Sequence, residues 1–198
     1  MMFTKQHKKR YLAIAVALTL GGSLWGGAAC TEAADDYTID AGNPTPDAAH
    51  SVPDEGNGPG VAAGFTNAAA PLTGKTLTVD GVTYAGIAYG GYNQGGGVTG
   101  NHLIIQNGGR LFYHAGNGGD AFGGRAGLGG DARGNTVMID GGTVDQSVYG
   151  GYLSPGNVNG SAVGNHVTIK GAASSIDRNV YGGYIQDYDN TGTVTGTS

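Results

Sequence analysis

Aliphatic residues recur at every second position in four short segments after residue 74. One set of alternate positions is aliphatic throughout: Leu77, Val79, Leu103, Ile105, Val137, Ile139, Val167 and Ile169. The opposite set is mixed in polarity: Thr78, Asp80, Ile104, Gln106, Met138, Asp140, Thr168 and Lys170. Because successive side chains of a strand point to opposite faces, each segment predicts a strand with one row in a core and the other toward solvent.

A second strand-like segment follows each of these four. It has a small apolar residue (Ala88, Ala121, Val148 or Val180) followed by an aromatic residue and Gly-Gly. The first strands begin at Lys75, Asn101, Asn135 and Asn165, at intervals of 26, 34 and 30 residues, and a fifth copy is expected to begin at Gly196-Thr197. A repeat of this length predicts stacked coils that bury a continuous core only together.

The expected fold is therefore all-β, a parallel β-helix (β-solenoid) of about four coils of roughly 30 residues, with at least two strands per coil. Stacking predicts two aromatic ladders: Tyr89, Phe122, Tyr149 and Tyr181 in one, and Tyr92, Tyr152 and Tyr184 in the other. We expect one tyrosine of each Tyr-Gly-Gly-Tyr motif in the core and the other on the surface. The paired glycines predict a tight bend or close backbone contact, and residues 113–134 predict the longest loop.

The composition narrows the function classes. Glycine accounts for 41 of 198 residues, and only 13% of residues are charged. Four of the ten basic residues precede residue 30, which leaves six against fifteen acidic residues and a net charge of −9 for the rest. An acidic chain without a basic stripe predicts no nucleic-acid partner. Cys30 is the one cysteine, so no disulfide forms within the chain.

The sequence predicts three regions. Residues 1–29 have a basic start and an apolar stretch of about ten residues, which are typical of a secretory signal peptide. Residues 30–73 are rich in Ala, Asp, Pro and Gly and predict a low-order linker or an N-terminal cap, with one capping strand at 36–40. Residues 74–198 are the repeats. Cys30 directly follows the signal, so a lipid anchor at this residue is an alternative.

Three features of the sequence have some of the residues of a metal site. The glycine-rich stretch from Gly116 to Asp131 lacks the tandem spacing of calcium-binding repeats, and the segment 187–192 begins like a calcium loop but would end at Ser198 instead of a glutamate. His102 and His166 share a repeat position, but Thr136 lies between them. The sequence therefore assigns no catalytic, cofactor-binding or metal-binding residue.

Some β-helices cleave polysaccharides with carboxylates gathered on one face, so a carbohydrate-active enzyme is a second alternative. The row of Asp80, Gln106, Asp140 and Lys170 is mixed in sign, and the chain has none of the familiar hydrolase or phosphate-binding motifs. We therefore expect no catalysis.

The repeats carry a family resemblance. The string Gly-Asn-x-Val-x-Ile-x-Gly-Gly with Val-Tyr-Gly-Gly-Tyr is present at 134–142 with 148–152, again at 164–171 with 180–184, and more weakly at 100–109 with 122–125. It resembles the passenger region of bacterial autotransporter adhesins, which use type V secretion. The resemblance implies a surface-exposed structural or adhesive protein with a host protein or glycan as partner. It also implies an outer-membrane translocator barrel in the full-length protein, of which this chain is expected to be an N-terminal fragment.

Overall fold

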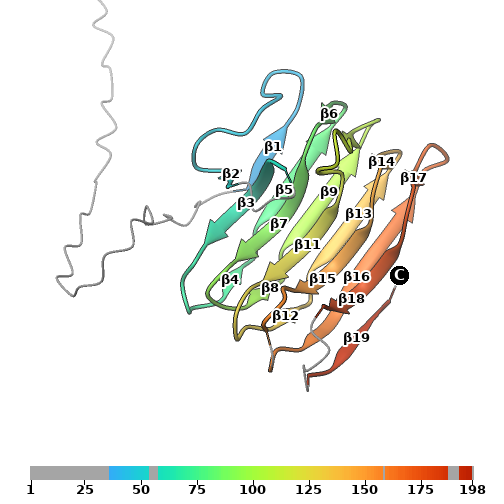
Figure 1. Cartoon of the computed structure of the whole chain (residues 1–198). Coiled ribbons are helices and arrows are strands. Elements are labelled where there is room, and N and C mark those ends of the chain that lie inside the picture. The colour runs from blue at the N-terminus through green and yellow to red at the C-terminus, as the bar shows by residue number, and fades with distance from the viewer. Residues whose placement is uncertain (1–35, 54–57, 158, 187–191, 198) are drawn as a thin grey trace, which may run out of the picture.

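The chain folds as a parallel β-solenoid, and the predicted fold class is confirmed. A computed structural model describes residues 36–53, 58–157, 159–186 and 192–197. Successive coils stack from the blue to the red end of Figure 1, with strands of neighbouring coils side by side. The described residues contain strands and no helix, so no helix in this part of the chain could cross a membrane. The predicted signal peptide (1–29) and Cys30 lie outside the described residues.

Each complete coil has four strand segments. The first coil has β4 (Leu72–Thr73), β5 (Thr76–Asp80), β6 (Thr83–Tyr84) and β7 (Ile87–Asn93). The second has β8 (Val98–Thr99), β9 (His102–Gln106), β10 (Arg110–Leu111) and β11 (Ala121–Ala126), and the third has β12 (Ala132–Arg133), β13 (Thr136–Asp140), β14 (Thr143–Val144) and β15 (Val148–Leu153). In the fourth, β16 (Ala162–Lys170) spans the first two segments, followed by β17 (Ser175–Ile176) and β18 (Val180–Ile185).

These segments form three sheets. Sheet 1 contains the β5, β9, β13 and β16 ladder together with β4, β8 and β12; sheet 2 contains β6, β10, β14 and β17; and sheet 3 contains β3, β7, β11, β15 and β18. Equivalent repeat positions pair in register, as Val137 does with Leu103 and Val167. The predicted fifth copy begins with β19 (Val194–Thr197), in which Gly196 pairs with Asn165.

An additional partial coil precedes the first full repeat. The expected capping strand is β1 (Tyr37–Ile39), which pairs with β5. β3 (Gly60–Thr66) pairs with β7, and the short β2 (Ser51–Val52) adds the one antiparallel pair among the described strands. Part of the region expected to be a linker or cap thus continues sheets 1 and 3. Its Ala- and Gly-rich composition concealed these strands, because pairing with the next coil supplies their hydrogen bonds.

The loop predicted for residues 113–134 was wrong as a single loop. β11 and β12 interrupt it and pair with the neighbouring coils on both sides. Gly123 and Gly124 belong to the β11 repeat motif, and Gly127, Gly129 and Gly130 lie in the turn between β11 and β12.

The aliphatic row fills the interior as predicted. Leu77, Val79, Leu103, Ile105 and Ile139 are all fully buried and belong to one continuous cluster with Ala88, Ala121 and Val148 of sheet 3. The aliphatic row is more exposed to solvent in the fourth coil, where 47% of the surface of Ile169 is exposed.

A ladder of buried asparagines runs beside this core. Asn101, Asn135 and Asn165 occupy the same position in successive coils and have no exposed surface. The Nδ2 of Asn101 donates to Oδ1 of Asn135 at 3.1 Å, and the Nδ2 of Asn135 donates to Oδ1 of Asn165 at 2.9 Å. The backbone amides of Asn101 and Asn135 also donate to the next Oδ1, at 3.0 and 2.9 Å. Each side chain therefore joins two coils through several buried hydrogen bonds.

Tyr84 places an unpaired hydroxyl at the core. Its oxygen is buried and has no hydrogen-bond partner among the described residues. Burial raises the pKa of Tyr84 from 10.0 to about 12. The folded protein therefore holds this proton more tightly than the unfolded chain, and the stability linked to it is complete below pH 10 and is lost as the pH rises toward 12.

We expect Tyr84→Phe to keep or raise the unfolding free energy at neutral pH, by up to about 1 kcal/mol, because it removes an unsatisfied buried hydroxyl. It should also reduce the loss of stability between pH 10 and 12. Chemical denaturation across this pH range measures both effects. Tyr113→Phe, at an exposed tyrosine, is the control. A clear loss of stability at neutral pH in Tyr84→Phe would contradict the assignment of an unsatisfied hydroxyl.

Candidate functional site

The outer face of sheet 3 carries the aromatic ladders that the repeats predict. In the first row, stacked rings join Tyr89 to Phe122, Phe122 to Tyr149, and Tyr149 to Tyr181, with centroid separations of 5.1, 4.8 and 5.2 Å. The second row contains Phe65, Tyr92, Tyr152 and Tyr184, with Arg125 in register between Tyr92 and Tyr152. We call these two rows together the aromatic face.

The prediction of one core and one surface tyrosine per motif was wrong. Ala88 lies in the interior cluster, whereas Tyr89 and Tyr92 both belong to a second cluster on the opposite side of the strand. Both are almost fully buried, at 2% and 3% exposure, because they stack on each other and on the adjacent coils. The irregular step at Gly90, between these two tyrosines, returns the second one to the same face as the first.

Arg125 takes a tyrosine position in the second row. Its guanidinium carbon lies 4.6 Å from the ring centroid of Tyr92 and 5.7 Å from that of Tyr152. Its Nε donates to Oγ of Ser154 at 3.0 Å, and its Nη1 donates to the hydroxyl of Tyr89 at 3.2 Å. A planar cation thus continues the stack and brings hydrogen-bond donors into an otherwise aromatic row.

A hollow of about 260 Å³ opens beside Arg125, and we call it the aromatic hollow. Its lining combines apolar and polar side chains: Ile87, Asp120, Phe122, Arg125, Tyr149, Tyr152, Pro155 and Gln186. Phe122 and Tyr152 meet at an interplanar angle of 79°, and Tyr149 and Tyr152 at 77°, so their rings form a corner. A second hollow of about 360 Å³ shares Arg125 and Pro155 and extends to Tyr92, Gln94 and Leu128.

Burial shifts the pKa values of three side chains that line the aromatic hollow. Desolvation raises the pKa of the Asp120 carboxyl, while a hydrogen bond from the Ser147 amide and the charge of Arg178 favour its ionised form. Burial also raises the pKa of Tyr149, and raises that of Tyr152 to about 12, so both phenols are neutral at physiological pH. The hydroxyl of Tyr152 donates to Oε1 of Gln186.

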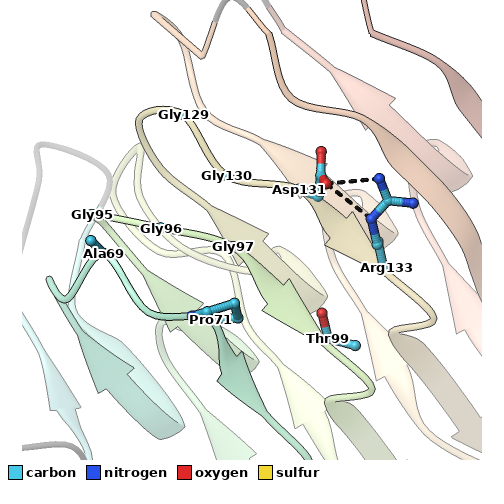
Figure 2. A pocket seen from close by; sticks show the side chains of 10 residues that line it. All are labelled: Ala69, Pro71, Gly95, Gly96, Gly97, Thr99, Gly129, Gly130, Asp131 and Arg133. Carbon is cyan, nitrogen blue, oxygen red and sulfur yellow. Dashed lines mark hydrogen bonds and ion pairs between the residues drawn. The ribbon is translucent and has the colours of Figure 1, made fainter.

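A larger hollow of about 400 Å³ lies at the turns that lead from sheet 3 back to sheet 1 (Figure 2). Backbone lines most of it, from Gly95 to Gly97 and at Gly129 and Gly130. Its charged side chains are paired with each other, because Nε and Nη2 of Arg133 both donate to Oδ2 of Asp131. With few side-chain groups directed at a ligand, this hollow is the weaker candidate.

The residues weighed as metal ligands are not brought together. Asp120 and Asp131 lie beyond opposite ends of β11, and segment 187–192 falls almost entirely outside the described residues. His102 and His166 flank Thr136 in register, and Nδ1 of His102 lies 2.7 Å from the Thr136 hydroxyl. In the described part of the chain, no group of three or more His, Cys, Asp or Glu side chains is placed to hold a metal.

The mixed polar row lies on the outer face of sheet 1. Asp80, Gln106, Asp140 and Lys170 are consecutive in register, as the repeat alignment implied. Gln106 donates to Asp80, and Lys170 forms an ion pair with Asp140 at 3.0 Å. The two carboxylates of this row therefore each have a partner and are separated by Gln106.

The aromatic hollow was not predicted from sequence. In the sequence, Asp120 falls within the glycine-rich stretch from Gly116 to Asp131, and Arg125 ends the weaker repeat match at 122–125. The departure from Tyr at position 125 was the available signal, since one copy alone places a charge where the other copies place an aromatic ring.

Comparison with known proteins adds no relative: no protein-family model, curated protein or solved structure matches the chain. The fold and the aromatic face define a β-solenoid of repeated Tyr-Gly-Gly-Tyr coils, and any functional assignment rests on the chain's own residues.

Proposed function

We propose that the protein is an exported cell-surface passenger with a structural or adhesive role and no catalytic role. The aromatic face is the observation that carries this proposal. The first row stacks rings from four coils, and the second row spans five coils with Arg125 in one of them. Both rows lie on the side of sheet 3 opposite the aliphatic interior. Aromatic and arginine side chains are the residues most enriched at binding hot spots.

The hydrogen bonds between successive coils of the solenoid support a role as a rigid scaffold. The four full coils pair in register with one another, and the asparagine ladder adds side-chain hydrogen bonds between coils. Such a one-dimensional stack holds an extended face and its turns at fixed positions. A host protein or glycan would bind this face, and the full-length protein would supply an outer-membrane translocator barrel.

Export and display can be tested in a Gram-negative host that expresses the full-length protein with an epitope tag between Ala172 and Ala173, both of which are exposed. We expect antibody to label intact cells, and deletion of residues 1–29 to abolish the labelling. Labelling seen only after lysis would contradict surface display. The same cells should adhere to an epithelial layer more than cells with an empty vector.

Two alternatives make different predictions. A lipid anchor at Cys30 predicts incorporation of labelled fatty acid that is lost in Cys30→Ala. A β-helical carbohydrate-active enzyme predicts release of new reducing ends from acidic or neutral polysaccharides. Neither signal is expected from a non-catalytic passenger.

A further inference from the structure

The aromatic hollow combines apolar ring edges with groups that donate and groups that accept hydrogen bonds. The rings of Phe122 and Tyr152 are nearly perpendicular and buried. Tyr89 and Tyr149 cover the two faces of Phe122, and Tyr184 and Arg125 cover those of Tyr152, so the two rings line the hollow with their edges. The Asp120 carboxylate accepts hydrogen bonds, the Arg125 guanidinium donates them, and the Gln186 amide does both. A ligand that fits this lining would present C–H groups to the apolar edges and several groups that both donate and accept hydrogen bonds.

We propose that the aromatic hollow binds one neutral sugar ring of a glycan chain. The C–H groups of a sugar ring can lie against the ring edges, Ile87 and Pro155 of the lining, and its hydroxyls both donate and accept hydrogen bonds. This inference rests on the proposed adhesive function, and it names the class of partner that the aromatic face recognises.

The charges in the hollow favour a neutral sugar over an acidic one. Asp120 brings a partly buried carboxylate next to the ligand, and a second carboxylate there would be repelled and poorly solvated. Arg125 does not act as a dedicated anion site, because it already stacks on Tyr92 and donates to Ser154 and Tyr89. Asp120 and Arg125 together leave no net charge in the hollow.

The size of the hollows fits a short stretch of a chain. At about 260 Å³, the aromatic hollow is smaller than most small-molecule pockets, which span roughly 300–1,000 Å³, and one ring is its natural occupant. The neighbouring hollow continues past Arg125 along Tyr92 and Gln94. A second sugar unit would lie there, so we expect oligosaccharides to bind better than single sugars.

The test uses the exported protein and saturation-transfer NMR with four neutral probes, the methyl glycosides of glucose, galactose, mannose and N-acetylglucosamine, and their trisaccharides. Sialyllactose is the acidic probe. Tyrosine fluorescence gives affinities without interference, because the one tryptophan of the chain, Trp25, lies within the predicted signal peptide. We expect saturable binding of at least one neutral series, tighter for the trisaccharide, and weaker binding of the acidic probe.

Two substitutions alter the site and keep the backbone pairing between coils, although Arg125→Tyr also removes the hydrogen bonds to Ser154 and Tyr89. Asp120→Asn keeps an oxygen to accept the Ser147 amide but loses the charge. Arg125→Tyr restores the residue found at this position in most other coils, and it should fold because tyrosines already stack there. Each is expected to weaken neutral-sugar binding at least tenfold, whereas Asp131→Asn, in the hollow of Figure 2, should leave it unchanged.

Absence of saturable binding by any neutral probe, unchanged binding in both site variants, or tighter binding of sialyllactose would overturn the proposal. Its failure is distinguishable from failure of the proposed function. If tagged cells are labelled and adhere while no sugar binds, the passenger role stands and the partner is a protein. If sugars bind but the tag is never exposed on cells, the site stands and the surface role fails.

Discussion

Asn135→Ala is expected to lower the free energy of unfolding by about 3–5 kcal/mol, since each buried polar group left without a partner costs roughly 1–3 kcal/mol. Oδ1 of Asn135 accepts from both the backbone amide and Nδ2 of Asn101, and its own Nδ2 donates to Val98 and Asn165. Alanine removes all of these at a fully buried position. It also removes buried side-chain volume between two coils.

Chemical denaturation followed by far-UV circular dichroism measures this loss, and hydrogen exchange locates it. Protection should fall first at the amides of β9 and β13, on either side of the missing rung. Asn67→Ala, at an exposed asparagine, is the matched control and should change stability by less than about 0.5 kcal/mol. A loss of under 1 kcal/mol in Asn135→Ala would show that the ladder contributes little beyond the backbone pairing.

The asparagine ladder shows which features of the fold could be predicted from the sequence and which could not. Aliphatic alternation at Val137 and Ile139 identified the strands and the core row, because strand geometry imposes a period of two on any half-buried strand. The repeat pattern identifies Asn135 as the start of a repeat but does not reveal its role, because its buried side chain is satisfied by groups of the two adjacent coils: Asn101, Asn165 and the Val98 carbonyl. Pairing between coils is invisible in a single copy of the repeat.

The candidate site was less accessible for the same reason. The hollow beside Arg125 is assembled from four successive coils, with Ile87, Asp120, Tyr152 and Gln186 each contributed by a different one. The stacking of tyrosines was predicted. Whether the second tyrosine of a motif lies on the same side of sheet 3 as the first depends on the irregular step at Gly90. A repeat alignment gives the register of the rows and says nothing of that step.

Gly123→Ala is expected to destabilise the protein by about 3 kcal/mol or more, because overpacking a filled site typically costs 1–3 kcal/mol and here only backbone could move. A β-carbon at position 123 would lie 2.5 Å from the carbonyl oxygen of Gly150 and 2.7 Å from that of Thr136. The first belongs to the adjacent coil in sheet 3 and the second to sheet 1. Both sheets approach this glycine closely, which is the contact that the Gly-Gly pair predicts.

The second glycine of the pair gives a graded comparison. A β-carbon at Gly124 would lie 2.5 Å from Cγ and Oδ1 of Asn135, so Gly124→Ala should displace the asparagine ladder and destabilise to a similar degree. A β-carbon at Gly134 would meet no atom within 4 Å, but the alanine would have to adopt a φ of +59°. Gly134→Ala therefore measures the cost of the backbone conformation alone, which we expect to be about 1 kcal/mol.

Gly42→Ala meets only Asp40 at an ordinary 3.4 Å, without a positive φ, and should be nearly neutral. Thermal and denaturant unfolding of the four variants should therefore rank position 123 with 124, then 134, then 42. If Gly123→Ala destabilised the protein no more than Gly134→Ala, sheets 1 and 3 would be able to move apart to accommodate the added β-carbon. The repeated Gly-Gly would then reflect the bend of the chain alone, and the close contact between sheets 1 and 3 would not be what limits this position to glycine.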